Sequence, residues 1–273
     1  MYYYNSGKTE RKAIEVFLKC NFVKMLENNI DCLVNQEFRD ITENTSTFDF
    51  VDIMSKSPND NNKKYWKEKD SQTKFVYELI YQCLEFMNSY EQLEMSIALL
   101  EKSDKQDNKY DLSRYYFETF ISELYIFRKR IENIHNIMWK QARVLKMASE
   151  IDLINKNKDD FIKRLSLLNK DRTSHVHFDR YSDDFFLKVK TYRYFIKEIP
   201  VIDKDILEKD LIENYAIHKK SLLEVMQAKL VVLEHITIDI LDKLALPFKK
   251  IYNSSGSQKF EIFRFNIPEK QPI

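Results

Sequence analysis

Residues 71–102 read SQTKFVYELIYQCLEFMNSYEQLEMSIALLEK, and this stretch decides the fold. Its apolar side chains recur at intervals of three and four residues, at Phe75, Leu79, Cys83, Phe86, Met87, Leu93, Ile97 and Leu100. This interval matches the 3.6-residue turn of an α-helix, so the apolar side chains share one face. The stretch predicts a long amphipathic helix that begins at about Asp70 and ends at about residue 102.

The same spacing predicts helices on both sides of this stretch. We expect them over residues 9–38, 113–148, 158–169, 182–197 and from 203 or 204 to about 246, where Pro247 ends the last one. The helix over 113–148 would be roughly 54 Å long, which suits a kinked helix, an extended hairpin or a dimer surface. One short strand is expected over 258–265. The predicted fold class is all-α, a bundle of long helices.

Glycine is the most informative residue count, because the chain has only two glycines, Gly7 and Gly256. Phosphate-binding loops and nucleophile elbows need glycine for close backbone approach and for positive φ. None can be drawn between residues 8 and 255. Few glycines also mean few tight turns, which argues against a β-sandwich or barrel. We expect no nucleotide cofactor.

Composition and charge further limit the class of protein and the partners to be expected. The chain has 273 residues, of which 44% are hydrophobic, so a sizeable core is expected. The net charge of +1 predicts no overall attraction to nucleic acid or membrane. Three cysteines without a CxxC pair, and no long apolar run, predict a cytoplasmic protein with no membrane partner.

Three parts of the chain differ in pattern. Residues 1–69 combine an N-terminal helix with a polar linker, whose turn-rich centre is 55–64. Residues 70–250 carry the helical bundle, and residues 251–273 form a C-terminal tail. We predict these three divisions as the domain organisation.

One interhelical segment, residues 171–179, concentrates chemistry: DRTSHVHFD contains two histidines, an arginine and two aspartates. In an extended strand His175, His177 and Asp179 would point to one side and could ligate a metal. In a structural interpretation, Asp171 and Ser174 would cap the next helix, and the arginine would pair with a carboxylate. His135, His218 and His235 each lie alone in a predicted helix, and we interpret them as structural.

The third interpretation rests on a resemblance. Arg172-Thr173-Ser174-His175-Val176-His177 is an arginine, four residues and a histidine, which resembles the RxxxxH signature of HEPN domains. The resemblance covers about residues 70–250 and includes the helical setting. It implies a metal-independent endoribonuclease that acts on RNA as a homodimer, a toxin or defence effector, and an antitoxin or other partner protein. His177 fits the family spacing, whereas His175 would lie closer to Arg172 on a straight helix.

What the resemblance implies for the residues agrees with their chemistry. Imidazole titrates near neutral pH, so His177 would act as the acid/base, with His175 assisting or orienting. Arg172 would bind the phosphate with a planar, permanently charged guanidinium. Because each chain carries one such motif, a twofold dimer with residues 171–180 near its axis would assemble a composite site.

Further cations and aromatic residues follow the motif. The cations Arg180, Lys188, Lys190 and Arg193 could contact RNA phosphates, and bases could stack on Phe185, Phe186, Tyr192 and Tyr194. In the other interpretation the aromatic residues belong to the core and the cations form a solvated face. The alternative function for the whole chain is a catalytically inert all-helical interaction or scaffold protein.

Overall fold

The computed structural model describes residues 17, 20–26, 71–105, 108–166, 168, 184–198 and 204–255. These residues confirm the all-α bundle, because nearly all are helical and none lies in a strand. The main elements are α5 (Ser71–Lys102), the 3₁₀ turn η2 (Ser103–Lys105), α6 (Lys109–Val144), α7 (Ala148–Ser166), α9 (Asp184–Glu198) and α10 (Lys204–Ser254). The predicted strand over 258–265 and the linker at 55–64 lie outside the described residues.

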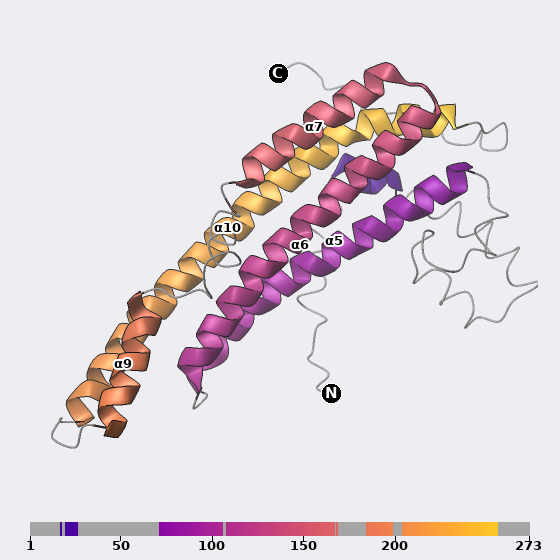
Figure 1. Ribbon diagram of the computed structural model, residues 1–273. Helices are drawn as coiled ribbons and strands as arrows, with labels where there is room; N and C mark the ends of the chain where they lie inside the picture. Colours follow the sequence, from indigo (N-terminus) through magenta and orange to yellow (C-terminus); the bar gives the residue numbers. More distant parts are fainter. Residues whose placement is uncertain are drawn as a thin grey trace, which may run out of the picture.

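Two long helices, α5 and α6, form an antiparallel hairpin (Figure 1). In α6 the buried side chains alternate at steps of three and four, at Phe117, Phe120, Leu124, Phe127, Ile131, Ile134 and Met138. Such a pattern keeps one seam facing the neighbouring helix, as in a coiled coil. The predicted 36-residue length is confirmed, but α6 begins and ends four residues earlier than expected.

A sharp reversal separates α6 from α7. Lys146 has φ of 57°, its N–H bonds to the Arg143 carbonyl at 3.1 Å, and the Met147 N–H bonds to the Ala142 carbonyl at 3.0 Å. This pair of bonds is a Schellman cap, which usually has glycine in the left-handed position. The expected helix over 113–148 is therefore wrong at its end, and α7 begins ten residues before the expected 158.

The longest helix, α10, runs the whole length of the molecule and spans 51 residues, roughly 76 Å (Figure 1). Pro247 lies inside it, so the prediction that Pro247 ends the helix is wrong. Proline removes one helical hydrogen bond. Burial of Phe248, the next residue, and of Ile251, one turn further on, holds the helix in place beyond that defect.

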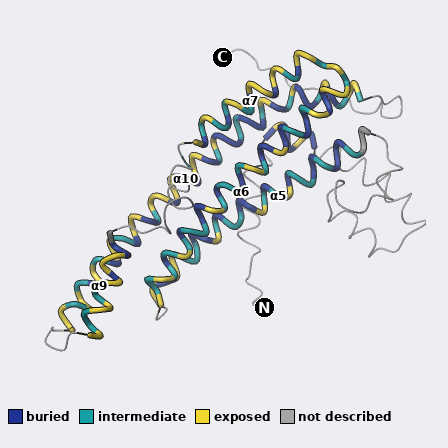
Figure 2. The backbone as a smooth tube through the Cα atoms, viewed as in Figure 1, coloured by how far each residue is buried: buried dark blue, intermediate teal, exposed yellow. Residues whose placement is uncertain are grey.

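The described helices form two regions, which we call the bundle and the arm. The bundle consists of α5, α6, α7 and residues 219–254 of α10, which lie side by side. The arm consists of α9 and residues 204–218 of α10, which run antiparallel at one end. Figure 2 shows buried residues concentrated in the bundle and more exposed ones along the arm.

The described N-terminal residues join the bundle core. The Phe17 ring meets Phe86 and Tyr90 edge to face at 5.0 and 5.1 Å. Residues 21–26 are helical, and Phe22 contacts Phe248 at 5.6 Å. These contacts attach the beginning of the chain to α5 and α10, while the division near residue 69 stays a prediction.

Candidate functional site

The motif that carries the sequence hypothesis lies outside the described residues. Arg172, His175, His177 and Arg180 all fall between α7 and α9. Chain connectivity puts this segment after Ser166, where α7 ends, and before Asp184, where α9 begins. The catalytic assignments therefore stay predictions.

Three of the predicted RNA-contacting cations are described, and all three are exposed on α9. Lys188 and Lys190 lie on its outer surface. Arg193 reaches back to the bundle hairpin, where its guanidinium pairs with Asp111 at 2.9 Å and lies 5.6 Å from the Tyr110 ring centroid. The two lysines are thus available to a partner, whereas Arg193 helps to hold the arm against α6.

The aromatic residues of α9 divide between the two interpretations. Phe185 stacks on His218 at 4.3 Å, and Phe186 meets the same imidazole edge to face at 5.1 Å. Both phenylalanines are buried, and the Tyr192 hydroxyl donates to Asp210. Tyr194 alone among the four is well exposed, at 60%. Three of the four aromatic residues therefore hold the arm together.

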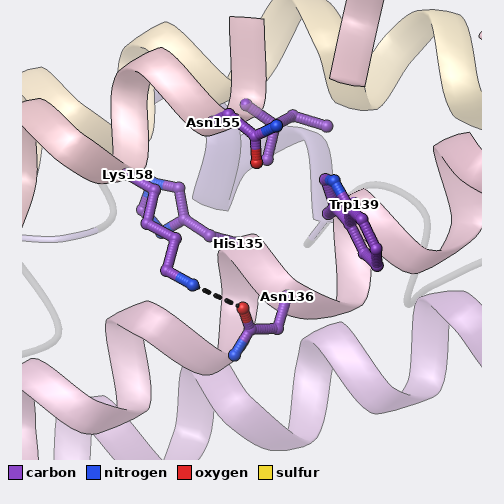
Figure 3. A pocket seen from close by; sticks show the side chains of 6 residues that line it. His135, Asn136, Trp139, Asn155 and Lys158 are labelled. Atoms are coloured by element: carbon purple, nitrogen blue, oxygen red, sulfur yellow. Dashed lines mark hydrogen bonds between the residues drawn. The ribbon is translucent and has the colours of Figure 1, made fainter. Parts of the chain in front are cut away.

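One pocket among the described residues lies between α6 and α7. It has a volume of about 310 Å³ and is lined by His135, Asn136, Trp139, Ile154, Asn155 and Lys158. Figure 3 shows His135 and Lys158 on one side, Trp139 on the opposite side, and the two asparagines between them. The Lys158 ammonium donates to the Asn136 amide oxygen at 2.8 Å and so bridges the two helices.

His135 is the unusual group of this pocket, because it is fully buried. Its Nδ1 donates to the Ile131 carbonyl at 2.8 Å, since a carbonyl can only accept. Burial lowers the pKa of His135 to about 4, helped by the Lys158 charge and opposed by the Ile131 bond. The ring is therefore neutral at pH 7, and Nε2 is an acceptor with no partner in the described part of the chain.

In the sequence His135 is one of three isolated helical histidines, and its interpretation as structural gave no indication of this pocket. Its position did contain a signal, because His135 is four residues after Ile131 and adjacent to Ile134, within the apolar stripe of α6. A polar residue in such a stripe is buried and needs a hydrogen-bond partner. The spacing could not reveal Trp139, Asn155 and Lys158 around it, because α7 supplies two of these three.

Another pocket, of about 410 Å³, lies where the arm meets the bundle. Its most buried cation, Lys219, already donates to Asp104 at 2.6 Å and to the Glu101 carbonyl at 2.8 Å. The Tyr215 hydroxyl nearby bonds to Ser103 and Ser113 at 2.9 and 2.8 Å. These hydrogen bonds connect α10 to α6, to the end of α5 and to η2, so Tyr215 and Lys219 are already engaged in holding the helices together.

The metal interpretation has no counterpart in the described part of the chain, where no cluster of three His, Cys, Asp or Glu side chains is arranged to hold an ion. His175, His177 and Asp179, which carried that interpretation, lie outside it. None of the described helices is long and apolar enough to span a membrane.

Comparison with known proteins found no matching family model, no matching curated protein and no matching solved structure. The HEPN resemblance therefore rests on the motif itself and on its helical setting.

Proposed function

We propose that this chain is a metal-independent endoribonuclease of HEPN type, which would serve as a toxin or defence effector. The observation that carries the proposal is the Arg-x4-His motif at residues 172–177, between two helices of an all-α protein. The exposed Lys188 and Lys190 on the next helix support it, because cations close to the motif would attract an RNA backbone.

In the proposed reaction the nucleophile belongs to the RNA. His177 takes the proton of a ribose 2′-hydroxyl, whose oxygen attacks the adjacent phosphorus while the bond to the 5′-oxygen breaks. Arg172 stabilises the charge that develops on the two non-bridging phosphate oxygens. His175 assists or orients. The departing 5′-oxygen takes a proton from water, so the products are a 2′,3′-cyclic phosphate and a 5′-hydroxyl end, and no metal takes part.

A second copy of the chain would complete this site. The arm, whose helix α9 follows the motif in the sequence, exposes several large apolar side chains, namely Leu187, Tyr194, Ile206, Ile212 and Ile217. Large apolar side chains are exposed on the bundle as well, so the choice of the arm as the interface rests on its following the motif in the sequence. A homodimer through the arm would bring two motifs towards one axis, and light scattering at micromolar concentration should give twice the chain mass.

The test of catalysis is incubation of the purified protein with mixed RNAs in EDTA. Removing His177 as H177A should lower the cleavage rate by about 10²–10⁴, since general acid–base catalysis contributes that much. R172K should also be impaired, because an ammonium cannot replace a two-pronged guanidinium. H235A is the matched control, since His235 is exposed on α10 far along the chain from the motif.

Other outcomes would redirect the proposal. Dependence on a divalent metal, with loss of cleavage in D179A, would favour the metal interpretation. If H175A lost cleavage activity while H177A kept it, His175 rather than His177 would be the acid/base residue. No cleavage of any RNA would leave the scaffold alternative, which the exposed apolar side chains of the arm also favour.

A further inference from the structure

One cation, Lys158, lines the pocket between α6 and α7, and a second, Arg143, lies beside its Trp139 wall. Lys158 is half-buried, and its ammonium bonds to the neutral amide of Asn136 rather than to a carboxylate. Arg143 lies with its guanidinium 5.0 Å from the Trp139 ring centroid. Neither cation makes an ion pair within the described residues.

Neighbouring cations on the other side of α7 do have carboxylate partners. Arg164 pairs with Asp160 at 3.7 Å and with Asp239, and Lys243 pairs with Asp239 at 2.8 Å. At the start of α7, Lys250 pairs with Glu150 at 2.8 Å. Lys158 is thus a cation of the pocket wall whose charge no carboxylate of the described residues neutralises through an ion pair, and an anionic group would be attracted to it.

The neutral groups of the pocket add a different kind of recognition. Trp139 offers an aromatic ring at the wall, and a planar ligand can stack on such a ring. Asn136 and Asn155 carry amides that both donate and accept. His135 closes the pocket from behind, but its Nε2 is fully buried and offers no atom to a ligand.

We propose that this pocket binds one nucleotide unit. Its base stacks on Trp139, the edge of the base faces the two asparagines, and its phosphate lies at Lys158. The volume of about 310 Å³ is at the lower end of ligand pockets, which suits one nucleotide and excludes a paired base. The proposal concerns binding alone and stands apart from cleavage by the 171–179 segment.

Tryptophan fluorescence offers a direct test, because the chain contains only Trp66 and Trp139. In a W66F background Trp139 is the single reporter, excited at the red edge of its band where nucleobases do not absorb. Adenosine, guanosine, cytidine and uridine monophosphates should quench or shift its emission saturably at neutral pH. Absence of a saturable change with all four and with a short single-stranded RNA overturns the proposal.

Matched lysine variants separate a built site from general electrostatic attraction. K158A should weaken monophosphate binding by about tenfold or more, because a charge-assisted hydrogen bond to phosphate is lost. It should change nucleoside binding little. K156A, on the exposed opposite side of α7, should bind as the wild type does. Equal weakening in both variants would overturn the assignment of the phosphate to Lys158 and the pocket with it.

Calorimetry then tests the stacking surface and the source of the nucleotide. W139A should lose most of the binding while circular dichroism shows an intact helical protein, and full affinity in W139A contradicts the proposal. N136D supplies a second variant, since a carboxylate beside Lys158 should repel the phosphate. Tighter binding of single-stranded RNA than of monophosphates would identify a strand as the ligand, and equal binding would identify a free nucleotide. RNA cleavage by H177A, measured separately, tests the proposed ribonuclease activity independently of nucleotide binding at this pocket.

Discussion

The bundle and the arm are built from similar helices, yet they differ in how many neighbours each helix has. In the bundle, α10 packs against α5, α6 and α7, so its side chains are buried every three or four residues up to Ile251. In the arm its main partner is α9, and Ile206, Ile212 and Ile217 remain exposed. An apolar pattern of helical period is thus insufficient to bury a helix, because burial needs partners on the matching face.

The two regions also differ in the surroundings of their polar side chains. The bundle buries His135 and encloses it with α6 and α7, so its electrostatics depend on desolvation. The arm relies on contacts nearer to solvent, such as Arg193 with Asp111 and Tyr192 with Asp210. Surface ion pairs contribute little to stability, so we expect the arm to open more readily than the bundle.

The largest effect should come from matched leucine truncations. Leu244 of the bundle is fully buried, and Leu211 of the arm is 5% exposed. L244A should lower the free energy of unfolding by about 4 kcal/mol through lost burial and a cavity. L211A should cost less than half of this, because the arm can open locally. Urea denaturation gives both values, and equal costs would show that the two regions unfold as one unit.

The next largest effect concerns acid. The folded pKa of His135 is about 4, below the ordinary 6.5, so between these values the unfolded chain binds a proton that the folded chain does not. Stability is therefore lost as the pH falls through this window, by roughly 3 kcal/mol in total. Denaturation of wild type and H135Q at a series of pH values should show a shallower slope in the variant. Identical slopes would mean that His135 is hydrated in the folded protein.

A smaller effect is expected where the arm meets the bundle. Lys219 is only 6% exposed, and its ammonium donates to Asp104 and to the Glu101 carbonyl. K219M removes two charge-assisted bonds and should cost about 1–3 kcal/mol. K220M, next to it on the exposed side, should cost almost nothing. Hydrogen exchange should show faster opening of α9 in K219M, and unchanged exchange would separate this contact from arm stability.

The smallest predicted effect is that of glycine substitution on stability, which has opposite signs within α6 and just after its end. Lys146 holds φ of 57° after the helix, where a side chain costs about 1 kcal/mol. K146G should therefore stabilise the bundle by about that amount. K140G, at an exposed position in the last turns of α6, should destabilise it by about 1 kcal/mol, because glycine disfavours helix. Thermal unfolding of both variants tests the cap, and a loss of stability in K146G would contradict it.

The sequence by itself was enough to predict the fold class and most helices, because spacings of three and four are a local property of the chain. For the candidate motif it supplied residue types and spacing alone, and their geometry stays a prediction. The sequence predicted the ends of the helices less well. Lys146 carries no glycine signal for the reversal, and Pro247 carries a strong stop signal that burial of its neighbours overrides.

Only the tertiary structure decided which polar residues became unusual. His135, His218 and His235 look alike in sequence, since each is a single histidine in a helix. Packing of α7 against α6 buried His135 and brought it beside Lys158, whereas His235 remained exposed. The physical reason is that desolvation and charge depend on every helix around a residue, while the local sequence specifies only the helix on which that residue lies.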